Sequence, residues 1–296
     1  MSKLSHRAEV SLAASPQRVF GALSEPAQLR EWFAEFAEVE PRVDGSFAFW
    51  GRYSYGIHER PQPVPRLSAF EPARRLAFTY RVDGVDSSVT FELAEDDSEK
   101  NRGGTRLVIL HEFAQAPAIG RARELIDDLW RIHAGNLQAW LSNPAAITRV
   151  DFTDPAPSVS ATILIDAPVE RVYASFLDPS MLDRWIASAA IVDPVVGGRY
   201  SYGWSYTIDE RKVAGGPARI IEMVPNRKLV TDWPDWRGDD SVPAQRITWL
   251  FEAEGNGTRV RVIHDRFVRA VDISDYPFGW PAFLGMLAPV FPSADT

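Results

Sequence analysis

The feature that most constrains the fold of this chain is an internal repeat. Residues 14–32 (ASPQRVFGALSEPAQLREW) align with residues 167–185 (APVERVYASFLDPSMLDRW), with six identities at one constant offset of 153. The same offset relates PARRL (72–76) to PNRKL (225–229) and His111 to His264. A register that holds along the whole chain predicts two diverged copies of one domain.

The repeat also predicts where the domains begin and end. We expect a first domain over residues 1–143 and a second over 158–296. The stretch between them, residues 144–157, is rich in Pro, Asp and Thr and is typical of a linker.

Composition limits the classes of function. The chain has 296 residues, 45% of them hydrophobic, which is enough apolar material for two cores. Its 40 acidic residues outnumber its 32 Lys and Arg, so nucleic acid is not an expected partner. The absence of cysteine and of any signal peptide or membrane-spanning stretch predicts a cytoplasmic location.

The order of elements is the same in both copies. Each opens with an alternating strand, at 8–13 and 160–165, followed by two short helices and then several antiparallel strands separated by Gly, Asp and Asn. Ser15 and Asp178 are typical helix N-caps.

The two copies differ at their C-terminal ends. Apolar residues recur at steps of three and four over 117–141, which predicts a long amphipathic helix in the first copy. The matching segment of the second copy, 280–291, is shorter, and we expect Pro281 and Pro289 to interrupt it. The fold class is therefore α+β, with a curved antiparallel sheet wrapped around a C-terminal helix, a layout that leaves room for a cavity.

These motifs resemble those of the START-like, or SRPBCC, superfamily. The resemblance is carried by the opening segments at 14–32 and 167–185, the turns VDGSF (43–47) and VGGRY (196–200), and the strand GTRLVILHEF (104–113). Within the superfamily the chain is similar to homologues of the activator of heat shock protein 90 ATPase, here as a tandem repeat. The resemblance implies two helix-grip domains with hydrophobic ligand cavities, and it leaves the activity open, because the superfamily includes carriers, receptors and polyketide cyclases.

Strand alternation predicts which side chains face the interior. Along 258–265, Val260, Val262 and His264 share one face, which is the apolar and therefore buried one. The matching strand of the first copy places His111 inward in the same way.

A seven-residue phrase, SYGIHER at 54–60, returns as SYTIDER at 205–211. If both are strands, alternation turns Tyr55 and Glu59 inward in the first copy and Tyr206 and Glu210 inward in the second. An inward Glu and an inward His could form an acid/base pair, because burial raises a carboxyl pKa and imidazole titrates near neutrality. The same pairs could instead orient one polar end of a ligand, or form plain structural hydrogen bonds.

Several further aromatic and His side chains are candidates to line a cavity. Core packing is the alternative for each of them alone, whereas the group suggests a chamber for an aromatic ligand. They are Trp50, Tyr80, His133, Trp140, Trp204, Trp233 and Trp280.

Motifs for metals, phosphates and nucleophilic catalysis are missing. The five His residues show no HExxH spacing, and GxSxG, GxxxxGK[ST] and GxGxxG do not occur, so we expect no metal and no cofactor. The leading hypothesis is the binding of a small hydrophobic or aromatic molecule. The alternatives are a cyclase-, dehydratase- or hydrolase-type enzyme that uses the Glu–His pairs, and a protein-interaction or co-chaperone-like module. The oligomeric state stays open, and the two copies could form an intramolecular pseudo-dimer.

Overall fold

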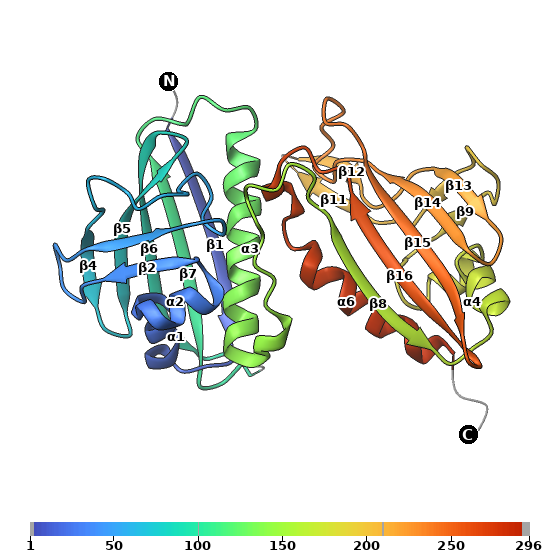
Figure 1. Ribbon diagram of the computed structural model, residues 1–296, viewed down its shortest axis with the longest axis horizontal. Helices are drawn as coiled ribbons and strands as arrows, with labels where there is room; N and C mark the ends of the chain where they lie inside the picture. Colours follow the sequence, from blue (N-terminus) through green and yellow to red (C-terminus); the bar gives the residue numbers. More distant parts are fainter. Residues whose placement is uncertain (1–2, 100, 209, 292–296) are drawn as a thin grey trace. The chain divides into compact units, whose positions relative to one another are not determined.

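The computed structural model of the protein describes residues 3–99, 101–208 and 210–291 (Figure 1). The chain divides into two compact units. The first comprises Met1–Pro155 with Arg269–Asp275, and the second comprises Ala156–Val268 with Tyr276–Thr296. Each unit contains one copy of the repeat.

The described residues of the first unit form a five-stranded antiparallel sheet, a small hairpin and three α-helices. In chain order these are β1 (Leu4–Leu12), α1 (Pro16–Ser24), α2 (Pro26–Trp32), β2 (Phe36–Val39), β3 (Phe47–Trp50), β4 (Leu67–Glu71), β5 (Arg75–Val82), β6 (Val85–Asp96), β7 (Gly104–Phe113) and α3 (Ala122–Ser142). The sheet order is β1-β7-β6-β5-β4, and β2 pairs with β3. Figure 1 shows α3 running along the sheet beside β1.

The second unit repeats this plan with shorter helices. Its elements are β8 (Val159–Ile165), α4 (Val169–Ser175), α5 (Pro179–Leu182), β9 (Ile191–Val192), β10 (Tyr200–Ser201), β11 (Ser205–Ile208), β12 (Arg211–Ala214), β13 (Ile220–Val224), β14 (Lys228–Trp233), β15 (Gln245–Glu254), β16 (Gly257–Asp265) and α6 (Tyr276–Leu287). The sheet order β13-β14-β15-β16-β8 is that of the first unit, and α6 packs against β8. Both units are therefore α+β helix-grip domains, as the sequence predicted.

Local signals explain where the helices begin. The Ser15 hydroxyl accepts from the backbone N–H of Arg18, and the Asp178 carboxylate accepts from that of Ser180, so both predicted N-caps are confirmed. The helix predicted from residue 117 begins at Ala122 instead, because Arg121 adopts a left-handed backbone conformation with φ of 58°.

The last helix of the second unit departs from the prediction. We expected Pro281 to interrupt it, but α6 continues through this residue and ends at Leu287, before a short 3₁₀ turn over Ala288–Val290. The missing N–H of Pro281 removes only the bond to the carbonyl of Pro277, which lies in the first turn of the helix.

The segment expected to link the domains packs on the first unit over much of its length. Asn136 of α3 exchanges two hydrogen bonds of 2.9 Å with the backbone of Thr148, and Val150 is buried. The Phe152 ring contacts Tyr55 with ring centres 5.7 Å apart. The domain boundaries at 143 and 158 stay predictions.

The repeated phrase does not form the same structure twice. Residues 54–60 form turns rather than a strand, because Gly51 and Gly56 have positive φ angles of 107° and 73° and Pro61 and Pro63 lack backbone donors. In the second unit the phrase forms the hairpin of β11 and β12, in which Ile208 pairs with Arg211. The prediction of an inward-facing strand in both copies is therefore wrong.

Candidate functional site

His111 of β7 is the centre of a buried polar network in the first unit, with none of its side chain exposed. The Trp130 indole of α3 donates to His111 Nδ1 at 3.0 Å. Because Nδ1 accepts, the imidazole proton lies on Nε2, which donates to Ser87 Oγ at 2.7 Å. The Ser87 hydroxyl in turn donates to the Tyr80 carbonyl at 2.5 Å. The network thus holds one neutral tautomer.

The second unit builds the equivalent network around His264 of β16. Trp280 of α6 donates to His264 Nδ1 at 3.2 Å, and His264 Nε2 donates to Gln245 Oε1 at 2.7 Å. Both copies therefore fasten their C-terminal helix to the sheet through a Trp–His hydrogen bond. The inward direction predicted for His111 and His264 is confirmed by their complete burial.

Burial keeps both imidazoles neutral at pH 7. Desolvation, with a smaller contribution from His6, lowers the pKa of His111 to about 3. Desolvation also lowers the pKa of His264 well below its usual value. Since both ring nitrogens of each His are engaged by other side chains, neither His is free to accept a proton from a substrate.

The predicted Glu–His pairs do not form. Glu59 is exposed in the turn region before Pro61, and Glu210 is exposed in the β11–β12 turn with a φ of 67°. Neither carboxylate faces the interior, because neither residue lies within a strand. The prediction that Glu59 and Glu210 point inward is therefore wrong. Without an inward Glu, the acid/base pair on which the enzyme alternative depended does not form.

Tyr80 contacts two other predicted residues of the first unit, His111 and Tyr55, while His133 packs on neighbouring aromatic rings. The buried Tyr80 ring stacks on His111 at 5.6 Å, and its hydroxyl donates to the Tyr55 carbonyl at 3.2 Å. Buried His133 packs against Phe33 at 4.4 Å and has no partner for its Nδ1 among the described residues. Desolvation lowers the pKa of His133 to about 3, and burial raises that of Tyr80.

Trp50 and Trp140 lie apart from this group. Trp50 is half-buried and stacks on Phe36 of the β2–β3 hairpin at 5.5 Å. Trp140 is half-buried near the end of α3, where its indole donates to Gln28 Oε1 at 3.4 Å.

In the second unit Trp233, His264 and Trp280 form a compact cluster, with ring centres 5.4 to 5.8 Å apart. Half-buried Trp204 borders it, 6.0 Å from Trp233. Tyr206 does not belong to the cluster, because its side chain is 40% exposed. The prediction that Tyr206 faces inward is wrong, since β11 belongs to an outlying hairpin rather than to the five-stranded sheet.

Sequence reasoning missed the residues that complete these clusters. They include Trp130, Ser87 and Gln245, and the position of Trp130, three residues before the candidate His133 on the same helix, was the one signal that could have indicated it. It also missed a group of buried polar side chains in the second unit that have no partner for one atom among the described residues. They are Tyr173, Trp185, Tyr202, Thr231 and Trp249.

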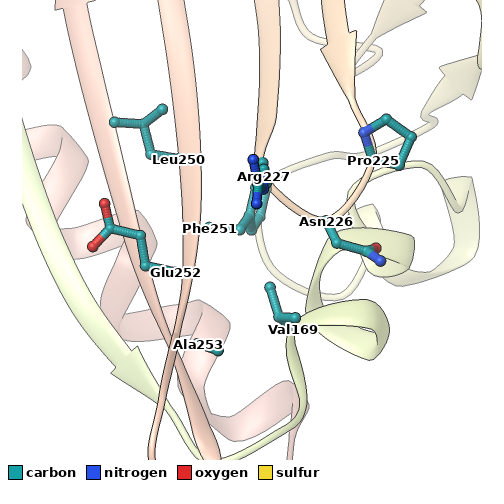
Figure 2. A pocket seen from close by; sticks show the side chains of 8 residues that line it. All are labelled: Val169, Pro225, Asn226, Arg227, Leu250, Phe251, Glu252 and Ala253. Carbon is teal, nitrogen blue, oxygen red and sulfur yellow. The ribbon is translucent and has the colours of Figure 1, made fainter.

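A surface groove of about 580 Å³ lies next to this group in the second unit. It is lined by Val169, Pro225, Asn226, Arg227, Leu250, Phe251, Glu252 and Ala253. Figure 2 shows Val169 and Asn226 on one side and Leu250 and Glu252 of β15 on the other. Buried Phe251 is common to both features, because it lines the groove and its ring packs against Tyr173 at 5.3 Å.

Two kinds of feature are absent from the part of the chain that the structure describes. No group of three or more His, Asp or Glu side chains there is placed to hold a metal ion. No helix within the same residues is long and apolar enough to cross a membrane.

Three solved structures align with this chain at low sequence identity. DynU16, a protein in the dynemicin biosynthetic locus, covers 97% of this chain and 99% of its own at 16% identity, with a TM-score of 0.42. The di-domain ARO/CYC BexL from the BE-7585A biosynthetic pathway covers 99% of both chains at 16% identity, with a TM-score of 0.35. Aha1 from Colwellia psychrerythraea covers 47% of this chain and 99% of its own at 18% identity, with a TM-score of 0.38.

No curated protein matches the sequence. The family model for Activator of Hsp90 ATPase homolog 1-like proteins matches twice, over residues 13–142 and 166–291. These two segments coincide with the two copies of the repeat and contain the two Trp–His networks. The chain therefore belongs to the Activator of Hsp90 ATPase homolog 1-like family, as a tandem member with two START-like domains.

Proposed function

We propose that the protein binds a small hydrophobic or aromatic molecule in the interior of its helix-grip units, between the sheet and the C-terminal helix. The observation that supports this function is that each unit holds buried polar atoms without partners inside an aromatic interior. Examples are His133 Nδ1 in the first unit and the Tyr202 hydroxyl in the second. Native interiors rarely leave such atoms unpaired. A bound molecule that forms hydrogen bonds with them would remove the free-energy cost of leaving them buried and unpaired.

The surrounding side chains suit an apolar ligand. His133 has Phe33, Trp130 and Phe152 as ring neighbours, at 4.4 to 6.4 Å between centres. Aromatic walls with a few polar atoms are the usual composition of small-molecule sites, where the walls supply affinity and the polar atoms supply orientation. A cytoplasmic location is part of this proposal.

Two measurements on the full chain test the function. Native mass spectrometry of the freshly purified protein, followed by denaturation, identifies any molecule that co-purifies. Titration with N-phenyl-1-naphthylamine, a neutral probe whose emission rises in apolar surroundings, then measures uptake by the emptied protein. Saturable uptake with one or two sites per chain is expected. A folded protein that takes up no probe and releases no molecule would contradict the proposal.

The interaction-module alternative has one observation in its favour. Ile191, Val195, Val196 and Ile221 of the second unit are each at least 40% exposed. The backbone N–H of Gly197 donates to the carbonyl of Ile220, so Val196 and Ile221 lie near each other. Three of the four matching positions in the first unit are polar, namely Glu38, Arg42 and Ser68.

Sedimentation velocity of the wild type and of Val196→Asp tests this second candidate. An association of the wild type that the charged variant abolishes would support an interaction surface, because a buried unpaired carboxylate is costly. Two identical monomeric profiles would argue against self-association through this patch.

A further inference from the structure

The two units differ in the chemistry of their interiors. At four positions related by the repeat offset, a Phe of the first unit is replaced by a hydroxyl-bearing residue in the second. At a fifth position, matched by its partners on the neighbouring strands, a Phe is replaced by a Trp. The matched pairs are Phe20 and Tyr173, Phe47 and Tyr200, Phe49 and Tyr202, Phe78 and Thr231, and Phe91 and Trp249. At these five matched positions the first copy is therefore apolar, whereas the second copy carries polar atoms.

Most of these added polar atoms have no partner among the described residues. The hydroxyls of Tyr173 and Tyr202 and the indole N–H of Trp249 are buried and unpaired. Trp185 shows the same contrast between copies. Its indole N–H is buried and unpaired, whereas the matching Trp32 donates to the Ala22 carbonyl at 3.0 Å.

The unpaired groups are close to one another. The rings of Trp185 and Trp249 lie 6.0 Å apart, and Phe176 contacts both of them. The Tyr202 hydroxyl lies close to the Trp249 N–H and to the Tyr200 hydroxyl, and weak hydrogen bonding to both offsets part of the rise that burial causes in the pKa of Tyr202, although neither contact has full hydrogen-bond geometry. The groups therefore form one cluster, supplied by α4, the residues after α5 and β10, and the central strand β15.

The atoms in this cluster specify a kind of ligand. An indole N–H can only donate, whereas a phenol hydroxyl both donates and accepts. The two indoles and two phenols of the cluster therefore carry more donors than acceptors, and the surplus donors require an acceptor from outside the cluster. The neighbouring His264 stays neutral, because desolvation lowers its pKa, and the cluster itself contains no charged side chain. A buried carboxylate or phosphate would therefore lack a counter-charge, which favours an uncharged acceptor such as a carbonyl oxygen.

We propose that the second unit binds a neutral, largely apolar molecule through a carbonyl oxygen that accepts hydrogen bonds from Tyr202 and Trp249, with Tyr173 and Trp185 as further donors. This inference rests on the proposed function and assigns it a ligand class and a unit. The first unit offers no donors at the matching phenylalanines. Phe251 lies between the cluster and the surface groove, because it lines the groove and its ring packs on Tyr173.

A matched pair of probes tests the inference on the full chain. Fluorenone and fluorene have the same three-ring shape and differ in one carbonyl oxygen. Calorimetric titration of the wild type should show fluorenone binding about tenfold more tightly than fluorene, the effect of one net hydrogen bond. Benzophenone and diphenylmethane repeat the comparison with a flexible shape.

Variants that restore first-copy residues identify the donors. Tyr202→Phe combined with Trp249→Phe should abolish the preference for fluorenone while leaving fluorene binding within about twofold, since the aromatic walls remain. Tyr200→Phe is the control, because that hydroxyl already donates to the Phe176 carbonyl at 2.8 Å, and it should leave the preference intact.

The outcomes separate the inference from the proposed function. Equal affinity of the wild type for ketone and hydrocarbon in both probe pairs would overturn the carbonyl assignment and leave apolar binding in place. A preference that survives in the double variant would also overturn it. If no probe of either pair binds to the folded protein, the proposed function fails with it.

Discussion

Replacing Tyr202 by Phe should make the empty protein more stable, although the change removes a polar group from the native structure. The Tyr202 hydroxyl is completely buried and has no partner among the described residues. A buried unpaired hydroxyl costs about 1–3 kcal/mol, and unfolding returns it to water. Phe occupies the matching position 49 of the first unit, so the ring alone is compatible with this fold. We expect the free energy of unfolding to rise by about 1 kcal/mol.

Tyr200, two residues earlier, provides a control of opposite sign. Its hydroxyl is equally buried but donates to the Phe176 carbonyl at 2.8 Å. Tyr200→Phe should lower the free energy of unfolding by about 1 kcal/mol, because the carbonyl loses its donor. Urea unfolding of the ligand-free full chain, with separate transitions fitted for the two units, measures both variants. If Tyr202→Phe is as destabilising as Tyr200→Phe, the Tyr202 hydroxyl is paired and the reasoning is refuted.

Two further predictions concern the His networks. Trp130→Phe should lower the free energy of unfolding by about 1–3 kcal/mol, because it leaves His111 Nδ1 buried without a donor. Trp140→Phe should lower it less, because Trp140 is half-buried and its hydrogen bond to Gln28 Oε1 is long, at 3.4 Å. Urea unfolding of both variants compares them, and equal losses would contradict the importance of the His111 bond. Acid should destabilise the first unit, since the pKa of His111 and of His133 is about 3 when folded and near 6.5 when unfolded. The contribution of the two neutral His residues to the free energy of unfolding is complete above pH 6.5 and is lost as the pH falls toward 3. The loss amounts to about 2 kcal/mol per His at pH 5. His133→Phe should remove its share of that loss, and an unchanged pH dependence would count against the buried neutral His.

The sequence was most informative where the repeat and strand alternation agreed. The periodic apolar face of 258–265 correctly placed His264 inside, and the offset carried the result to His111. Ser15 and Asp178 identified helix starts because N-caps depend on local chemistry alone.

Alternation failed where no regular strand forms. Glu59 and Glu210 were assigned an inward direction from period-two spacing, but glycines, prolines and a hairpin turn replace the strand at these positions. The polar cluster of the second unit was missed for another reason. The pair Phe20 and Tyr173 reads as a conservative change in the alignment, and whether a hydroxyl finds a partner depends on atoms from elements far apart in the chain.

The most direct test of the account is a crystal structure of the full chain with fluorenone bound. The account predicts the probe inside the second unit, with its carbonyl oxygen within hydrogen-bond distance of Tyr202 Oη or Trp249 Nε1. A second unit filled by its own side chains, with fluorenone only in the surface groove or absent, would contradict it.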